Sequence, residues 1–356
     1  MTPPLCNYGF EGLFLAAVSG SGVSATNNRA LLKDDGRLLS LIRRTGQPVA
    51  ELGGAEPSAF LEVLQNISIN LIAIPSKLKK SSTPTPTVTA ANDSALLILD
   101  HTGALKFAGL PREGDPAYGG GGVFGEVTGG AANGRNSTFQ FRAMFIPDNG
   151  APVQAIFQNT LNGTAPQRVI TTGALAPGAT PVTATFSSFP ALSHNLGFTL
   201  LRATLKGTDA SANEGLWLDN GLGLQKRVLK GDGLGGGVRI ARILKFWPAG
   251  SGQIVVQVIL TGTGVTSTNN AALLLCQSDG NYLTLLRTGD RAPGAGPATV
   301  LAIQAVEVNP LSGHYAVLGS LKGAKSGENQ ALWSGQTVAG NDTTLQQLRL
   351  PTLRLR

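Results

Sequence analysis

A repeated sequence frame constrains this chain more than any other feature. Residues 20–32 and 262–274 both read G-x-G-V-x-x-T-N-N-x-A-L-L, at a distance of 242 residues. Weaker copies begin at Leu205 and Leu321, and another follows the Pro/Thr-rich stretch 81–89. Internal copies at such a spacing are typical of proteins that stack one supersecondary unit several times.

A short glycine signal downstream of the copies, which is basic-x-Gly at Gly46, Gly114 and Gly289, fixes the length of the repeat. Its glycines are Gly46, Gly114, Gly173, Gly231 and Gly289, so the steps are 68, 59, 58 and 58 residues. The longer first step contains the 81–89 stretch, which we interpret as an extended loop. A sixth, divergent copy ends near Arg349. We therefore predict one domain of six repeats, approximately 1–58, 59–120, 121–180, 181–237, 238–297 and 298–356.

Each repeat contains short apolar runs that predict strands. In the fourth repeat these runs are 185–191, 198–205, 215–218 and 224–229, separated by Gly, Asn, Asp and Ser. No window of a dozen residues has helical periodicity without a glycine or proline inside it. A four-stranded sheet exposes two faces and must stack on neighbouring sheets. The sequence thus predicts an all-β fold, a six-bladed β-propeller with about four antiparallel strands per blade.

The two ends of the chain suggest how such a ring would close. Repeats two to six begin with an apolar strand, whereas repeat one starts almost directly at Cys6 and Asn7. The surplus stretch 350–356 follows the sixth repeat, and we expect it to pair with the first blade near residues 14–18, because open sheet edges are a liability. The alternative is a fragment of a longer tandem array. The five expected opening strands are 60–64, 123–127, 185–191, 239–246 and 300–308.

The repeat resembles a known bacterial family. Leu201, Arg202, Ala203 and Leu205, then Gly215, Leu216 and Trp217, carry the first half of the pattern, and Arg287, Gly289, Asp290, Ala292, Pro293 and Gly294 carry the second. The pattern is similar to that of bacterial tandem-repeat proteins with an N-x-x-G-x-x-x-F … R-x-G-D-x-A-P-G repeat. The resemblance implies a β-propeller-like fold, secretion and no known activity. Repeats one and three lack the Asp, and repeat two lacks the Ala-x-Leu.

Composition narrows the classes of partner. The net charge is +7, but only 14% of residues are charged and the basic residues are scattered in pairs such as Arg43-Arg44. No basic helix or RNA-binding aromatic signature accompanies them, so we expect no nucleic-acid partner. No apolar run approaches the ~20 residues of a membrane span, and no signal peptide is recognisable in the first 30 residues. We expect a monomer without a membrane partner.

Oxygen-bearing side chains near the turn after each opening strand are the best metal-ligand candidates. Equivalent positions of successive blades converge around a propeller axis, and amide and carboxylate oxygens are the ligands that Ca²⁺ prefers. The pattern therefore predicts a calcium site, although Asn is also a preferred turn residue. The candidate ligands are Asn7, Asn66, Asn133, Asn195, Asn309, Glu11, Glu126 and Glu307.

Two histidines are the candidate catalytic residues. His194 lies beside Asn195 at the candidate position, and His314 follows the turn two repeats later. The unperturbed pKa of histidine lies near neutral pH, which suits proton transfer. A solvent-facing or structural histidine is the alternative interpretation of each.

Two functions from different classes follow from these residues. The first is a metal-assisted hydrolase that acts on lactones or simple esters, a small-molecule substrate, at the central channel, with calcium as the cofactor. The alternative is a non-catalytic extracellular binding module that recognises a glycan or a protein through its loops. The low content of charged residues and the lack of any nucleophile motif favour the second function, whereas the recurrence of Asn or His at equivalent blade positions favours the first. The sequence prediction is the hydrolase, with the binding module as its alternative.

Overall fold

The fold is all-β, as the sequence predicts. The computed structural model describes residues 5–6, 12–66, 71–81, 87–105, 111–117, 120–132, 138–160, 164–195, 198–250, 252–310, 312–325, 327–337 and 346–348. In this part of the chain the strands form six antiparallel sheets of four or five strands, beside one 3-10 helix, η1 (Ala50–Leu52). The chain divides into two compact units, Met1–Ala174 and Leu175–Arg356.

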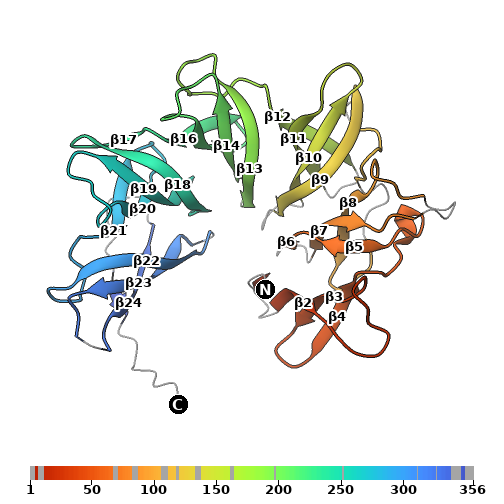
Figure 1. The fold of residues 1–356 in the computed structure, drawn as a ribbon, viewed down its shortest axis with the longest axis horizontal. Coiled ribbons are helices and arrows are strands. Elements are labelled where there is room, and N and C mark those ends of the chain that lie inside the picture. The colour runs from red at the N-terminus through yellow and green to blue at the C-terminus, as the bar shows by residue number, and fades with distance from the viewer. Residues whose placement is uncertain are drawn as a thin grey trace. The chain divides into compact units, whose positions relative to one another are not determined.

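The first unit contains three of these sheets among its described residues (Figure 1). One has the order β1 (Leu5–Cys6), β2 (Gly12–Ala17), β3 (Arg29–Asp34), β4 (Leu39–Arg44). In the next, β5 (Pro57–Phe60) and β6 (Leu64–Asn66) both pair with one edge of β7 (Leu71–Leu78), and β8 (Ser94–Asp100) pairs with the other. The third contains β9 (Gly122–Ala132), β10 (Thr138–Pro147), β11 (Val153–Thr160) and β12 (Thr164–Thr171).

The second unit contains the other three sheets in the described part of its chain, each with neighbouring strands consecutive in sequence. The first consists of β13 (Thr185–Asn195), β14 (Phe198–Lys206), β15 (Glu214–Asp219) and β16 (Leu224–Leu229). The second consists of β17 (Gly233–Gly235), β18 (Val238–Pro248), β19 (Ile254–Gly262), β20 (Ala271–Cys276) and β21 (Tyr282–Arg287). The last consists of β22 (Thr299–Val308), β23 (His314–Lys322), β24 (Gln330–Gln336) and β25 (Gln346–Leu348).

Three differences separate the described sheets from the predicted repeats. The strand β5 begins at Pro57, and β17 pairs with β18, so both belong to the sheet after the one expected. The opening strand expected at 60–64 is interrupted between β5 and β6, because 61–63 leave the ladder. Repeat one does have an opening strand, since β1 pairs with Gly12 and Leu13 of β2. The expected closing stretch 350–356 lies outside the described residues.

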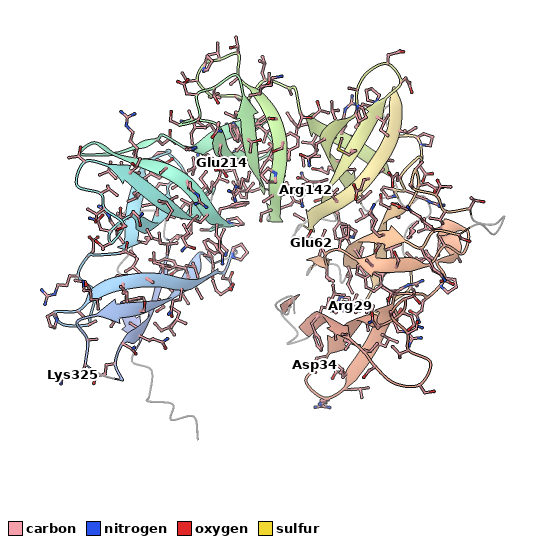
Figure 2. The ribbon with its side chains drawn as sticks, in the orientation of Figure 1. Arg29, Asp34, Glu62, Arg142, Glu214 and Lys325 are labelled. Carbon is pink, nitrogen blue, oxygen red and sulfur yellow. The ribbon has the colours of Figure 1, made fainter. Side chains whose placement is uncertain are left out.

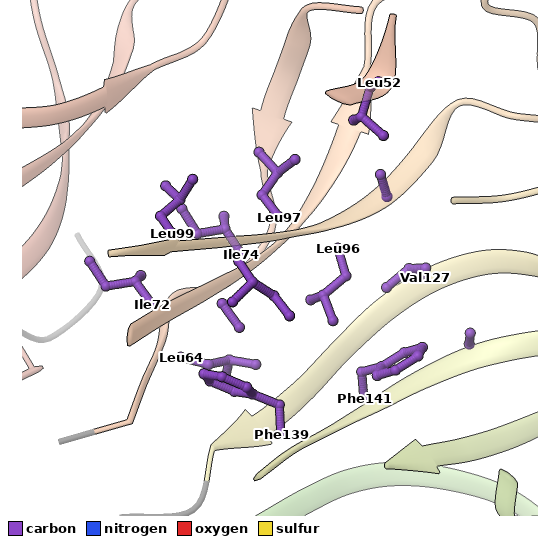
Figure 3. Close-up of a cluster of buried hydrophobic side chains, with 14 of the residues drawn as sticks. Leu52, Leu64, Ile72, Ile74, Leu96, Leu97, Leu99, Val127, Phe139 and Phe141 are labelled. Carbon is purple, nitrogen blue, oxygen red and sulfur yellow. The ribbon is translucent and has the colours of Figure 1, made fainter. Parts of the chain in front are cut away.

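Buried aliphatic and aromatic side chains fill the space between sheets within each unit. In the first unit, Ile72 and Ile74 of β7 and Leu96 of β8 pack with Phe139 and Phe141 of β10 (Figure 3). All five side chains are fully buried. The strands β7 and β8 are buried on both faces over most of their length, which is why they read as nearly continuous apolar runs.

The repeat glycines have a common backbone role. Gly46, Gly114, Gly173, Gly231 and Gly289 have φ values of 76°, 88°, 86°, 93° and 82°. In four of them the N–H donates to a carbonyl near the start of the next opening strand: the acceptors are Pro57, Phe124, Ile240 and Val300, at 2.7–2.8 Å. The left-handed conformation, which favours glycine, thus turns the chain from one sheet into the next.

The long opening strands contain paired β-bulges. In β9, β13, β18 and β22 the register shifts twice against the next strand. Each bulge adds one unpaired residue, bends the strand and resets the alternation of faces. In β18 the buried residues are consequently Ile240 and Ile243, three apart, and the exposed ones recur at the same interval.

Candidate functional site

The register supports the equivalence of the asparagine positions. Asn66 pairs with Leu71 and Asn195 pairs with Phe198, in each case as the last pair before the hairpin turn. Asn309 directly follows β22, and its N–H donates to the His314 carbonyl at 2.7 Å. The candidate ligands Asn7, Asn133 and Glu11 lie outside the described residues.

At Asn309 the side chain stabilises the turn. Its Oδ1 accepts the Ser312 N–H at 3.1 Å, and its carbonyl accepts the Gly313 N–H at 2.8 Å. Asparagine favours such positions because its amide can replace a backbone partner in the turn. The alternative interpretation from the sequence, a turn residue, therefore accounts for Asn309.

The two described glutamates do not occupy equivalent positions. Glu126 lies in the middle of β9, where its carboxylate contacts Lys77 Nζ at 2.9 Å. That ammonium group also contacts Asp93 at 2.8 Å. Glu307 is the next-to-last residue of β22, exposed and paired in register with Ala316. Glu126 therefore lies in the middle of its opening strand and Glu307 near the end of its own.

Burial changes the chemistry expected of His194. The side chain is 6% exposed and its Nδ1 lies 3.0 Å from Thr199 Oγ1. Burial lowers the pKa of His194 to about 4, against the weaker opposing effects of the Phe198 backbone and Asp219. The ring is therefore neutral at pH 7, unlike the near-neutral titration expected from the sequence. His314 is exposed at the start of β23.

We expect His194 to make stability depend on pH. Its pKa is depressed from 6.5 to about 4 in the folded protein. Above pH 6.5 the histidine is neutral in both the folded and the unfolded chain, so its full contribution to stability is present. Between pH 6.5 and 4 the unfolded chain binds the proton and the folded protein does not, so about 2–3 kcal/mol of the free energy of unfolding is lost. Urea unfolding of wild type and His194→Gln at pH 7 and 4.5 measures this. An equal loss in both proteins would contradict the prediction.

Among the described residues, no group of three or more His, Cys, Asp or Glu side chains is placed to hold a metal ion. No helix of the described chain is long and apolar enough to cross a membrane. The free thiol of Cys276 is buried, and burial raises its pKa to about 11.

Arginines at one register position tie neighbouring sheets together. Arg142 of β10 lies beside Glu62, which precedes β6 (Figure 2). Glu62 Oε2 accepts the Gly130 N–H at 3.2 Å, and burial raises the pKa of this carboxyl. Arg202, at the equivalent place in β14, binds Glu214 and donates to the Ile243 carbonyl at 2.9 Å. We interpret these cations as structural, because their partners belong to the framework.

A surface that the sequence reasoning missed lies on β18. Arg239, Arg242 and Lys245 are exposed, and the side chain of none of them forms a hydrogen bond or ion pair in the described part of the chain. They pair in register with Thr261, Ile259 and Gln257 of β19, so the two bulges place all three on one face. Trp247, two residues after Lys245, lies on the same face and is half-buried.

The features above define an all-β repeat protein whose sheets are linked by left-handed glycines. The chain belongs to the family of unknown function DUF7453, whose model matches residues 107–351. No curated protein matches the sequence.

Several solved structures resemble the fold. Acylaminoacyl peptidase from Pyrococcus horikoshii is 10% identical, with a TM-score of 0.44 over 97% of this chain and 44% of that chain. Prolyl oligopeptidase B from Galerina marginata is 8% identical, with a TM-score of 0.42 over 99% of this chain and 51% of that chain. Exo-beta-1,3-galactanase from Phanerochaete chrysosporium is 12% identical, with a TM-score of 0.32 over 93% of this chain and 72% of that chain.

These neighbours contain β-propeller domains. The chain spans about half the length of the two peptidases. All three TM-scores lie below 0.5, so the activities in these names describe those proteins alone.

Proposed function

We propose that this protein is a non-catalytic binding module. The observation that carries the proposal is the face of β18 formed by Arg239, Arg242, Lys245 and Trp247, which we call the β18 face. Cations without internal partners are free to bind a ligand, and a half-exposed indole adds apolar contact area beside them. Arg202, by contrast, is bound by the framework.

The described members of the expected hydrolytic site support the same choice. His194 is buried and neutral, Asn309 uses its amide oxygen in a turn, and Glu126 faces an ammonium group. A general base must reach the substrate proton, and a calcium ligand needs a free oxygen. Each of these three side chains already has a framework partner.

A calcium-dependent hydrolase of lactones or simple esters is the second candidate. The shared register position of Asn66, Asn195 and Asn309 favours it, because equivalent positions on successive blades can present amide oxygens to one ion. In this candidate Glu307 is the first choice of carboxylate ligand, and His194 assists proton transfer.

One experiment separates the two functions. We expect purified full-length protein to retain its ligand binding and melting temperature in EDTA, and to leave a panel of lactones and esters intact. One equivalent of bound calcium, lost with EDTA together with turnover, would instead establish the hydrolase. In that case Glu307→Gln should abolish metal retention, whereas His194→Ala should slow turnover and leave the metal bound.

For the fold we propose a six-bladed propeller closed by residues 350–356. Support comes from the six sheets of the described chain, each drawn almost entirely from one predicted repeat. On the first sheet, β1 pairs only with Gly12 and Leu13, so the rest of that edge of β2 has no strand partner among the described residues. That open edge coincides with the 14–18 segment chosen from the sequence.

Deleting residues 351–356 should destabilise a closed ring. We expect a loss of about 2–4 kcal/mol in the free energy of unfolding, because an edge reopens and Leu353 and Leu355 lose burial. The double variant Leu353→Ser/Leu355→Ser, which keeps the chain length, should lose most of the same amount. Urea unfolding measures both, and unchanged midpoints in the two variants would rule out closure by this stretch.

A further inference from the structure

We propose that the β18 face binds an anionic polysaccharide, a chain of sugars that carries carboxylate or sulfate groups at intervals. The inference rests on the proposed binding function and names its ligand class. It is carried by three unpartnered cations in a row, an indole beside them, and the bulged strand that holds them.

The cations form a regular array without internal neutralisation. Arg239, Arg242 and Lys245 recur every third residue, so the Cα atoms of neighbouring cations are at most ~10 Å apart along the strand. No Asp or Glu occurs between Asp232 and Asp279, so β18, β19 and β20 contain no carboxylate. The positive potential of this face is therefore not cancelled within the three strands, and it favours a ligand with several negative charges along its length.

Several other cations of the same unit have framework partners. Lys226 contacts Asp232 at 3.2 Å, and Arg227 donates to the Gly252 and Ser278 carbonyls. Arg287 donates to the Asn269 carbonyl at 2.8 Å. The β18 cations differ from these residues because no part of the described framework uses them.

Trp247 differs in the same way from the other two tryptophans. Trp217 and Trp333 are fully buried, and each donates its indole N–H to a proline carbonyl. Trp247 is half-buried and makes no hydrogen bond through its indole in the described chain. A partly exposed indole can stack on the apolar C–H face of a sugar ring while its N–H binds a hydroxyl.

The strand itself argues against two other polyanions. An acidic peptide could add to an open edge as a further strand, but the bulges at 241 and 244 interrupt the row of backbone groups that strand addition requires. Single-stranded nucleic acid stacks successive bases on several aromatic rings. Among the described residues of the β18 face, Trp247 is the single aromatic ring, so a sugar chain fits better.

The test uses the full-length chain and two charged polysaccharides. Heparin supplies sulfates, polygalacturonate supplies carboxylates, and dextran is the neutral comparison. We expect calorimetry at low salt to show binding to at least one of the first two and none to dextran. Binding should weaken as salt is raised, because exposed charges are screened.

A triple variant locates the site. Arg239→Gln/Arg242→Gln/Lys245→Gln should bind about tenfold more weakly, since each of the three exposed ion pairs contributes part of that factor. The matched control is Lys206→Gln/Lys322→Gln/Lys325→Gln, which removes three exposed cations from other strands and loops of the same unit. The control should bind as wild type does, and circular dichroism confirms that both variants are folded.

Fluorescence supplies an independent readout. Trp247 is the accessible indole of the three, so acrylamide should quench mainly this residue, and bound polysaccharide should protect it. Trp247→Phe should abolish the fluorescence that bound polysaccharide protects from acrylamide, while the phenyl ring preserves the apolar contact with the core.

The outcomes separate the inference from the function it rests on. Equal weakening in both triple variants, or no binding to either charged polysaccharide, would overturn the inference, although a neutral glycan or protein ligand would leave the binding module standing. Tighter binding of an acidic peptide or an oligonucleotide through the same three cations would also overturn it. Hydrolysis of the bound chain would instead overturn the non-catalytic function.

Discussion

Replacing Trp217 by alanine should lower the free energy of unfolding by about 3–5 kcal/mol, the range for removing a fully buried ring from a packed core. Trp217 is fully buried and packs edge-on against Phe186, with ring centroids 5.0 Å apart. Its Nε1 donates to the Pro177 carbonyl at 2.9 Å. The alanine variant loses both the packing and the donor, and urea unfolding measures the sum.

Two further variants separate these contributions. Trp217→Phe keeps a ring but leaves the Pro177 carbonyl without its donor, so we expect a smaller loss of about 1–3 kcal/mol. Trp333→Ala should behave as Trp217→Ala does, because Trp333 is equally buried and donates to the Pro293 carbonyl at 3.0 Å. If Trp217→Ala unfolds at the wild-type urea concentration, the indole has no such role.

The tryptophan contact explains a motif that the sequence presented without a reason. Pro177 and Pro293 each stand in an A-P-G triplet, and the carbonyl of each accepts the indole N–H of a tryptophan 40 residues later. Ala176 and Ala292 are buried, and Gly178 and Gly294 have φ values of 71° and 72°. Sequence alone shows that the triplet recurs, but the partner on a distant strand is visible only after folding.

The strands of the fourth repeat show how far local patterns reach. The runs 198–205, 215–218 and 224–229 correspond to β14, β15 and β16 within one residue at each end. The opening run 185–191 is too short by four residues, because β13 continues through Pro190 to Asn195. The second register shift lies between Ser188 and Ala191, and a bulge is a position where a strand tolerates proline.

The bulges also explain why the β18 face escaped the sequence reasoning. A half-buried strand is recognised by strict alternation of apolar and polar residues. In β18 the cations recur every third residue, a spacing that suggests neither a strand face nor a charged row. An unusual run of cations at that spacing next to a tryptophan is the signal that could have been used.

Burial also separates His194 from the proton-transfer role that the sequence suggested for it. His194 and Asn195 are neighbours at the end of β13, and the sequence offered either of them as the candidate position. The register assigns Asn195 to the asparagine position and leaves His194 buried beside Thr199. Burial then sets the pKa of His194, which no local pattern could supply.

The repeat glycines provide the second large effect. Gly289→Ala should destabilise the protein by about 2–4 kcal/mol, the sum of a left-handed conformation that alanine disfavours and a steric clash. Gly289 has φ 82°, and an added Cβ would lie 2.9 Å from Asn269 Cβ. Asn269 cannot easily withdraw, because its amide bonds Thr266 N–H at 2.7 Å and the Gly264 carbonyl at 3.0 Å.

A second glycine of the same sheet is the matched control for this variant. Gly280 has φ 89° in the turn between β20 and β21, but nothing lies within 4 Å of the Cβ that alanine would add. Gly280→Ala should therefore cost only the conformational part, about 1–2 kcal/mol. Gly46→Ala should match Gly289→Ala, because its Cβ would lie 2.9 Å from Asn27 Cβ, which makes the same two hydrogen bonds. Equal losses in Gly289→Ala and Gly280→Ala, measured by urea unfolding, would show that the asparagine turn yields and that the clash does not help to fix the repeat.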